Sequence, residues 1–319
     1  MTMRVVFMGT PAFAVPSLAV LLEEGAEVAA VVTQPDRPQG RKREPVPPPV
    51  KVFARERGLT VLQPERLRNL EAVAELAALR PDLIVTAAYG QILPRAVLDL
   101  PPRGCVNVHG SLLPRYRGGA PVQRAIMNGE TVTGVTLMYM EETLDTGDMI
   151  DRVEVPIAES DTAGDLFEKL GKAGAELLRR WLPALLAGTA PRTPQDGRLA
   201  TYAPNLTRED ERIDWTRASR QIYNQVRALA PMVGAYALCR GQPLKVWACL
   251  PPREADADLP AEWRRMPPGA VLEAGREGIR VRTGDGSLVL ATVQPAGKKA
   301  MGAADFARGA RLAPGDLLG

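Results

Sequence analysis

The chain has 319 residues, of which 45% are hydrophobic and 24% are charged, and its formal net charge is +3. This is the composition of a folded globular protein rather than of a collagen-like or disordered chain, and the length is enough for two domains. No apolar run approaches the ~18 residues that a membrane-spanning helix needs, and the amino terminus lacks the pattern of a signal peptide, so we expect a cytoplasmic protein without a membrane partner.

The first half of the chain alternates short apolar runs with helical patterns. Four runs are predicted as buried strands: residues 4–9, 27–33, 82–89 and 105–109. Two longer patterns are predicted as amphipathic helices: residues 11–25 and 65–79. This alternation predicts an α/β domain with a doubly wound, mostly parallel sheet covered on both faces. Ligands bind such sheets outside the carboxyl ends of the strands, and His109 ends the last of the four.

The second half changes in character after a strand-like run at 131–140 and a long helical pattern at 162–188. A turn-rich segment at 191–207 is predicted as a linker. A short helix at 218–229 is followed by strand-like runs divided by Gly and Pro, near 234–240, 243–250, 278–283 and 287–296. We therefore expect a first domain over 1–190 and a small antiparallel β-barrel over 208–319.

His109 is the only histidine in the chain. Asn107 lies two positions earlier in the same predicted strand, so both side chains should share one face of the sheet. Together they offer two hydrogen-bond donors, one of which can exchange a proton. This suits a reaction in which an oxygen gains negative charge while a neighbouring group loses or gains a proton. The alternative is structural, with the two residues bonding main-chain groups at a strand end.

An acidic loop follows the strand-like run at 131–140 and supplies a third group. Asp145 lies in it, with Glu141, Glu142 and Asp148 as other candidates. A carboxylate close to His109 would orient the imidazole or hold a water, whereas an acidic loop by itself is usually only solvated.

Several other chemistries lack their motifs. The first turn, "FMGTPAFAVPSL", has one glycine where a dinucleotide site needs three, which argues against NAD, and no phosphate-binding loop is present. Three widely spaced cysteines and one histidine argue against disulfides and against a metal site. Ser111 near His109 raises a serine hydrolase, but no G-x-S-x-G motif accompanies it. A Cys105 thiolate is disfavoured by its place inside an apolar strand.

A second basic feature is the Pro- and Gly-rich stretch at 34–58. It carries four basic residues close together: Arg37, Arg41, Lys42 and Arg43. A long basic loop at this edge of a parallel sheet is typical of a phosphate-backbone contact, with an exposed solubilising loop as the alternative.

The sequence resembles one family over nearly its whole length. The shared stretches are "RVVFMGTPAFAVPSL", "QPDRPQGR", "PPPVKVFA", "AAYGQILP", "NVHGSLLPRYRGGAP", "TGVTLMYMEETLDTGDMI", "TYAPNLTREDERIDW" and "QPAGKKAMGAADFARG". These are similar to the methionyl-tRNA formyltransferase family, whose members have a Rossmann-like formyltransferase domain and a C-terminal OB-like barrel. The resemblance implies transfer of a formyl group from 10-formyltetrahydrofolate to methionyl initiator tRNA, through a tetrahedral intermediate and without a covalent enzyme adduct, a metal or NAD. We expect the chain to act as a monomer.

The resemblance also implies roles for particular residues. Asn107, His109 and Asp145 correspond to the catalytic residues. The folate site corresponds to Ser111, Leu112, Leu113, Pro114, Tyr89, Gly90, Gln91, Ile92, Leu93, Glu142 and Leu144. Contacts with tRNA are expected from Arg37, Arg41, Lys42, Arg43, Lys298 and Lys299. Asn205 stands where the family commonly has Lys, Lys42 where it often has Gly, and residues 230–237 lack its usual Trp.

Two readings compete with tRNA formylation. One keeps the formyl chemistry and changes the acceptor to a nucleotide-sugar amine; a purine precursor is a weaker case, because the purine enzyme needs no C-terminal barrel. The other is a tRNA-binding module without catalysis, against which the intact Asn107, His109 and Asp145 argue.

Overall fold

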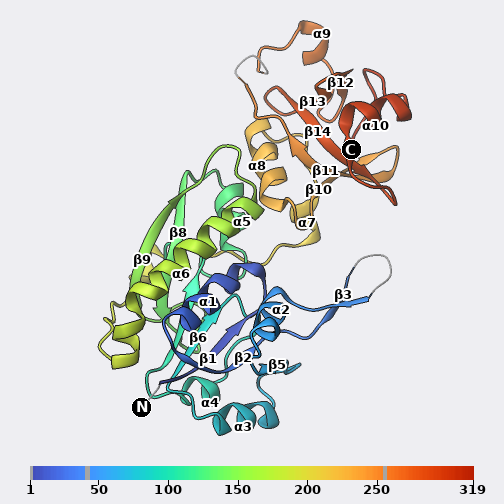
Figure 1. The fold of residues 1–319 in the computed structure, drawn as a ribbon. Coiled ribbons are helices and arrows are strands. Elements are labelled where there is room, and N and C mark those ends of the chain that lie inside the picture. Colours follow the sequence, from blue (N-terminus) through green and yellow to red (C-terminus); the bar gives the residue numbers. More distant parts are fainter. Residues whose placement is uncertain (1–2, 40–43, 254–256) are drawn as a thin grey trace. The chain divides into compact units, whose positions relative to one another are not determined.

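The computed structural model describes residues 3–39, 44–253 and 257–319 (Figure 1). Arg41, Lys42 and Arg43, expected to contact tRNA, lie outside the described residues. The chain forms two compact units. The first comprises Met1–Pro121, Val132–Pro156 and Phe167–Ala203, and the second Val122–Thr131, Ile157–Leu166 and Pro204–Gly319.

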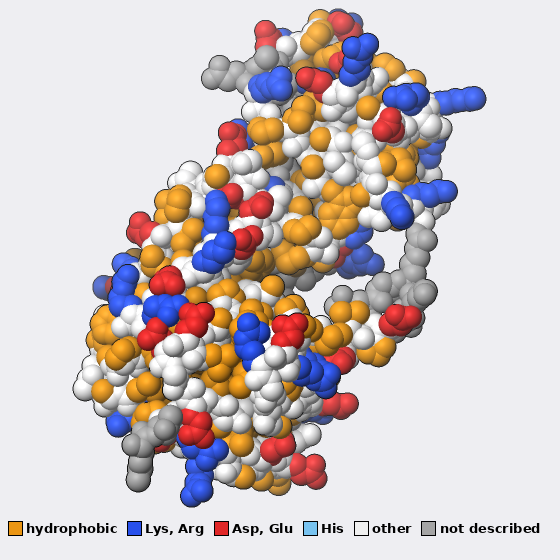
Figure 2. Space-filling model, in the orientation of Figure 1, with side chains coloured by type: hydrophobic (Ala, Val, Ile, Leu, Met, Phe, Trp, Pro, Cys, Tyr) orange, Lys and Arg blue, Asp and Glu red, His pale blue; other side chains and the backbone are white. Residues whose placement is uncertain are grey.

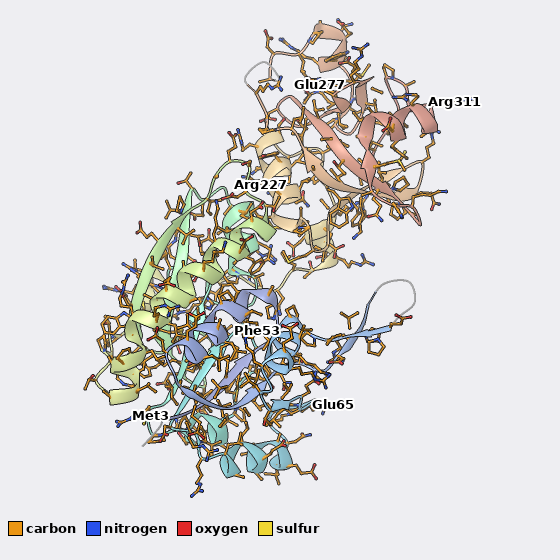
Figure 3. All side chains as sticks on the ribbon, in the orientation of Figure 1. Met3, Phe53, Glu65, Arg227, Glu277 and Arg311 are labelled. Atoms are coloured by element: carbon orange, nitrogen blue, oxygen red, sulfur yellow. The ribbon has the colours of Figure 1, made fainter. Side chains whose placement is uncertain are left out.

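This division differs from a continuous one because two short segments, 122–131 and 157–166, group with the second unit. Arg227, labelled in Figure 3, shows how the second of them is held. Its guanidinium, on a side chain that is 8% exposed, donates to the carbonyl oxygens of Ala158 (3.3 Å) and Asp161 (3.0 Å). The bounds 1–190, 191–207 and 208–319 remain a prediction.

The first unit is built on a seven-stranded sheet with the order β5-β2-β1-β6-β7-β8-β9. The strands are β1 (Arg4–Gly9), β2 (Glu27–Val32), β5 (Val61–Leu62), β6 (Leu83–Ala87), β7 (Cys105–His109), β8 (Val132–Tyr139) and β9 (Met149–Pro156). Neighbours from β5 to β7 are parallel, whereas β8 and β9 are antiparallel to theirs. The mixed, mostly parallel sheet confirms the predicted fold class.

Helices cover both faces of this sheet. They are η1 (Ala12–Ala14), α1 (Val15–Glu23), α2 (Pro49–Glu56), α3 (Leu70–Ala78), α4 (Arg95–Leu98) and α6 (Ala163–Ala187), while α5 (Pro121–Met127) follows β7. Residues of α3 and α4 join a core with Val6, Met8, Ile84 and Cys105. Gly174 of α6 lies against Val108, which alternates with Cys105 and so points to the other face. Asn107 and His109 therefore share the face that α3 and α4 cover.

Three predictions for the first unit were wrong in detail. The helix expected at 11–25 starts as the 3₁₀ turn η1, and α1 follows with a proline in its first turn. The helix expected from residue 65 begins at Leu70, because the Gln91 side chain accepts the Leu67 N–H (2.8 Å) and holds that stretch as a loop. The basic stretch expected as a loop contains the hairpin β3 (Arg37–Gln39) and β4 (Glu44–Val46), and then α2.

The second unit contains an antiparallel sheet with the order β10-β11-β14-β13-β12, and β15 pairs with β14. Its strands are β10 (Ala235–Cys239), β11 (Gln242–Cys249), β12 (Val271–Gly275), β13 (Gly278–Arg282), β14 (Ser287–Pro295) and β15 (Met301–Gly302). Its helices are α7 (Arg208–Glu211), α8 (Ser219–Leu229), α9 (Ala261–Arg264) and α10 (Ala303–Ala310). The 3₁₀ turn η2 (Gly197–Leu199) precedes them in sequence and belongs to the first unit. Leu318 bridges Cys239 of β10, and Leu317 bridges Ala270 beside β12. The last residues of the chain thus join the two edges of the sheet, as in a barrel.

No helix of the described ranges combines the length and apolarity needed to cross a membrane.

Candidate active site

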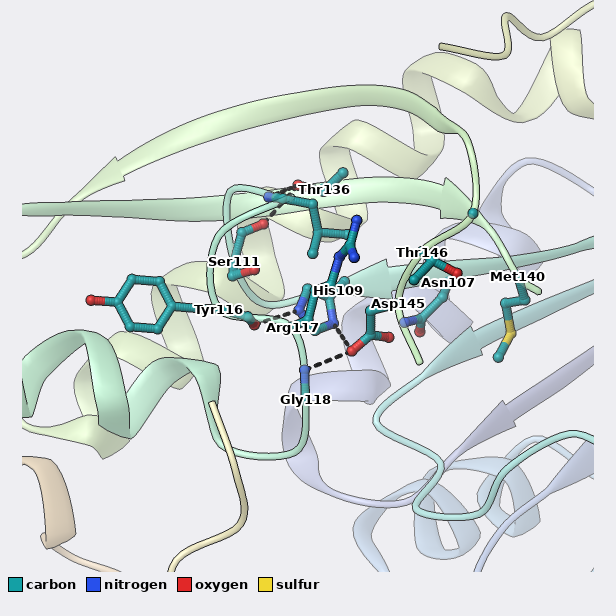
Figure 4. A network of polar contacts seen from close by, with 12 residues as sticks. Asn107, His109, Ser111, Tyr116, Arg117, Gly118, Thr136, Met140, Asp145 and Thr146 are labelled. Carbon is teal, nitrogen blue, oxygen red and sulfur yellow. Dashed lines mark hydrogen bonds and ion pairs between the residues drawn. The ribbon is translucent and has the colours of Figure 1, made fainter. Parts of the chain in front are cut away.

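His109, Asn107 and Asp145 come together at the carboxyl end of β7 (Figure 4). The His109 side chain is 6% exposed, and its Nε2 lies 3.2 Å from the carbonyl oxygen of Tyr116. A carbonyl only accepts hydrogen bonds, so Nε2 carries the proton in the neutral ring and Nδ1 does not. Nδ1 faces Asp145 Oδ2 at 3.8 Å. This separation is too long for a hydrogen bond but within the distance of an ion pair with a protonated ring.

Asp145 is held in place by Gly118. The Gly118 N–H donates to Asp145 Oδ2 at 2.8 Å, and Figure 4 shows the carboxylate facing both Gly118 and His109. Gly118 has φ +124°, and a Cβ there would lie 2.6 Å from the Ala203 carbonyl oxygen, so only glycine fits. Asp145 itself has φ +52°, a left-handed conformation that needs support from its surroundings.

The amide of Asn107 is oriented by Thr86, a residue that sequence reasoning missed. The Thr86 hydroxyl lies 2.8 Å from Asn107 Oδ1, with the Val106 carbonyl (3.1 Å) and Met140 Sδ (3.2 Å) as longer alternatives. Because Oδ1 is the acceptor of this bond, the Asn107 NH₂ group is presented as a donor away from Thr86. The sequence does indicate Thr86 in one way: it is a lone hydroxyl residue inside the apolar run of β6, the strand that pairs with β7.

The segment after His109 is held in place by hydrogen bonds between hydroxyl side chains and its main chain. The Thr136 hydroxyl donates to the Ser111 carbonyl (2.7 Å) and accepts the Leu113 N–H (3.0 Å). Ser111 Oγ donates to the Arg115 carbonyl (2.8 Å), so it is engaged structurally and is not arranged as a nucleophile toward His109. Leu113 is fully buried, whereas Leu112 is partly exposed.

The residues expected near the folate divide by exposure. Tyr89 and Leu93 are each 3% exposed and belong to the core, and burial raises the pKa of Tyr89 to about 12. Gln91 is bonded to the loop before α3. In contrast, Ile92 (78% exposed) and Leu144 (57% exposed) present apolar side chains to the surface, and Glu142 is exposed as well.

The described residues expected to contact tRNA are all exposed. Arg37 lies on β3, and Lys298 and Lys299 follow β14 in the second unit. Lys299 lines a groove of about 750 Å³ together with Trp247 and Gln294. In Figure 2 the Lys and Arg side chains on the visible face of the second unit are dispersed rather than gathered in one patch.

The described residues include no group of three or more His, Cys, Asp or Glu side chains that could hold a metal ion. The three cysteines are free, and burial raises the pKa of the Cys105 thiol to about 12. A protonated, buried thiol does not act as a nucleophile.

Comparisons with known proteins match both halves of the chain to known families. Residues 3–182 match the formyl transferase family and residues 205–311 match the formyl transferase C-terminal domain. Methionyl-tRNA formyltransferases from Bacillus subtilis and Geobacillus thermodenitrificans are 52% and 53% identical, over 99% of this chain and 98% of each relative.

Solved structures share the fold at lower identity. HypX from Aquifex aeolicus in complex with tetrahydrofolic acid is 19% identical with a TM-score of 0.64, over 96% of this chain and 47% of that chain. An N-formyltransferase from Helicobacter canadensis, in complex with folinic acid and dTDP-3-aminofucose, is 20% identical with a TM-score of 0.63, over 94% of this chain and 100% of that one. With two domain matches and full-length relatives at about half identity, the chain belongs to the formyl transferase family and, within it, to the methionyl-tRNA formyltransferases.

Proposed function

We propose that this chain transfers the formyl group of 10-formyltetrahydrofolate to the α-amino group of methionyl initiator tRNA, with Asn107, His109 and Asp145 as its catalytic residues. The observation that carries the proposal is the meeting of these three side chains at the end of β7, in a chain about half identical to methionyl-tRNA formyltransferases over its full length.

The geometry supports a division of roles. Nδ1 of His109 lacks a proton in the neutral ring and can take one from the methionyl amine as it attacks the formyl carbon. The ring then carries a positive charge beside Asp145. The Asn107 NH₂ group and the newly formed Nδ1–H donate to the formyl oxygen as it gains negative charge. The bond between the formyl carbon and the folate nitrogen then breaks, and the proton passes from His109 to that nitrogen. The formyl carbon moves directly from one nitrogen to the other, without bonding to the protein.

The folate site is proposed along the loops that follow β6 and β7 and that carry Asp145. The exposed Ile92 and Leu144 fit an apolar ring, which would remove their surface from water. The Ser111–Pro114 segment forms a wall held by Thr136. The side chains of Tyr89 and Leu93 are buried in the core, and that of Gln91 is bonded to the loop before α3. Gly90, Gln91 and Leu93 would therefore contact the folate through main-chain groups.

The tRNA contacts are proposed as phosphate contacts from Arg37, Arg41, Lys42 and Arg43 of the first unit and from Lys298 and Lys299 of the second. Asn205 replaces one positive charge, so this chain relies more on those residues. We further propose that the enzyme acts in the cytoplasm as a monomer. Replacing Lys298 and Lys299 by Gln should weaken tRNA binding and reduce its salt dependence, because each lost phosphate contact lowers the slope by about 0.9.

The test is formyl transfer from 10-formyltetrahydrofolate to three acceptors: methionyl initiator tRNA, methionyl elongator tRNA and a dTDP-amino sugar. Selective transfer to the initiator supports the proposal. Transfer to the sugar amine alone would replace it with the sugar reading, and tRNA binding without transfer to any acceptor would replace it with a binding module.

A further inference from the structure

Gln195 makes an unusual set of contacts with the turn that carries Asp145. Its Nε2 donates to two main-chain carbonyls of that turn, Asp145 O (2.9 Å) and Gly147 O (2.8 Å). Both protons of one amide group are thus used on residues two positions apart. A side chain that spans the turn in this way opposes the relaxation of Asp145 from its left-handed conformation.

The orientation of the Gln195 amide is set by Arg117. Gln195 Oε1 accepts from Arg117 Nε (3.1 Å) and Nη2 (2.7 Å). The Arg117 side chain is 6% exposed, so its hydrogen bonds are shielded from water. Because the oxygen of the amide faces the guanidinium, its NH₂ group must face the turn.

Three consecutive residues, 116–118, connect His109, Gln195 and Asp145. Tyr116 accepts from His109 through its carbonyl, Arg117 holds Gln195 through its guanidinium, and Gly118 donates to the Asp145 carboxylate. Asp145 is therefore held at its carbonyl from Gln195 and at its carboxylate from Gly118. Arg117, which orients Gln195, and Gly118 directly follow Tyr116, whose carbonyl oxygen bonds His109.

Gln195 is itself anchored on both sides in sequence. Thr193 forms two main-chain bonds with Met149 at the start of β9 (2.8 and 2.9 Å). The Arg117 N–H donates to Thr201 O (2.8 Å), and the Ala203 N–H donates to Arg117 O (2.7 Å). The segment 193–203 thus follows a defined path along the first unit, although its composition predicts a linker.

We infer that Gln195, oriented by Arg117, is a positioning residue for formyl transfer, which holds the Asp145 carboxylate at its place beside His109. The inference rests on the proposed function, because it gives Asp145 a role in the reaction. Gln195 is not a catalytic residue in this scheme, since its polar atoms are used on the protein. Its removal should lower kcat and leave the KM for both substrates nearly unchanged.

The first test is Gln195→Ala, with Arg198→Ala as a matched control. Arg198 lies in the same segment, and within the described ranges its exposed guanidinium contacts Asp196, two positions earlier, and no other residue. We expect Gln195→Ala to lower kcat by ~10–100-fold, the range for a catalytic group displaced by about 1 Å, and Arg198→Ala to match the wild type. An unchanged kcat in Gln195→Ala overturns the inference.

A double-mutant cycle separates positioning from general destabilisation. In an Asp145→Ala background, Gln195→Ala should cause little further loss, because it acts only through Asp145. A full additional loss in that background would show a merely structural role and overturn the inference. Arg117→Lys keeps one donor for Gln195 Oε1, so its kcat should lie between those of the wild type and Gln195→Ala.

The experiments distinguish a failure of the proposed function from a failure of the positioning role of Gln195. If the wild-type chain formylates no methionyl-tRNA, that proposal falls. If the wild type is active and Gln195→Ala equals it, only the positioning role falls.

Discussion

The Nε2 atom of His109 lies 3.2 Å from the carbonyl oxygen of Tyr116, and this one contact decides which ring nitrogen is available for chemistry. Nδ1 is left to face Asp145. The arrangement resembles other sites in which a carbonyl sets the tautomer of a reactive histidine.

Replacing His109 by Ala should therefore remove the proton acceptor and one donor together. We expect kcat to fall by ~10²–10⁴-fold, the usual contribution of acid–base catalysis, while tetrahydrofolate binding and the circular dichroism spectrum are retained. Single-turnover transfer to methionyl initiator tRNA measures the loss. A His109→Ala enzyme with wild-type turnover would falsify the mechanism.

Thr86 should act through the Asn107 amide. Thr86→Val has nearly the same shape but lacks the hydroxyl that binds Asn107 Oδ1, so the amide can rotate. We expect kcat to fall by about fivefold, the equivalent of one hydrogen bond of ~1 kcal/mol. Thr86→Ser keeps the hydroxyl and is the matched control. Equal kcat values for the Val and Ser variants would show that Thr86 does not orient Asn107.

Gly118→Ala should disturb both stability and activity. The added Cβ would lie 2.6 Å from the Ala203 carbonyl in a backbone of φ +124°, which we expect to cost about 1–3 kcal/mol. Moving Gly118 also removes the N–H that holds Asp145, so kcat should fall. Gly197→Ala is the control, because a Cβ there meets nothing within 4 Å. Denaturant unfolding and turnover of both variants check this, and similar behaviour of the two would contradict it.

Asp36 should make stability depend on pH. The Gln63 amide and the Lys51 ammonium hold the pKa of Asp36 below its usual value, and Lys51 is 5% exposed. A lowered carboxylate pKa stabilises the folded state above the unfolded value of ~3.9, and this contribution is lost as pH falls through the folded pKa.

The free energy of unfolding of Asp36→Asn should thus lie below that of the wild type at pH 7, with the difference shrinking below about pH 4. Asp99→Asn, which breaks the exposed pair with Arg95, should change little. A difference for Asp36→Asn that does not vary between pH 7 and pH 3 would contradict the assignment.

Cys105 should be inert in the folded protein. It is 3% exposed and burial raises its pKa to about 12, so it remains a thiol at neutral pH. Iodoacetamide at pH 8 should leave it unmodified by peptide mass spectrometry, and Cys105→Ala should keep the wild-type kcat. Loss of turnover in a folded Cys105→Ala enzyme would contradict this prediction and indicate that the Cys105 thiolate takes part in the reaction.

The sequence by itself determined five strands of the first unit's sheet, β1, β2, β6, β7 and β8, and the placing of Asn107 and His109 on one face of β7, whereas β5 and β9 were not predicted. Both follow from local rules, since buried strands are apolar runs and side chains alternate with a period of two. The family followed from motifs spread along the whole chain. A short strand such as β12, and a helix as small and Ala-rich as α10, gave too weak a periodic signal to be predicted.

Only the tertiary structure decided which groups support the catalytic residues. Thr86 lies 21 positions from Asn107, and Gln195 lies 50 positions from Asp145. A turn-rich stretch predicts an exposed connection, but composition does not show that one of its amides binds a turn elsewhere. Such contacts depend on how segments distant in sequence pack together, and no local pattern of residues records that packing.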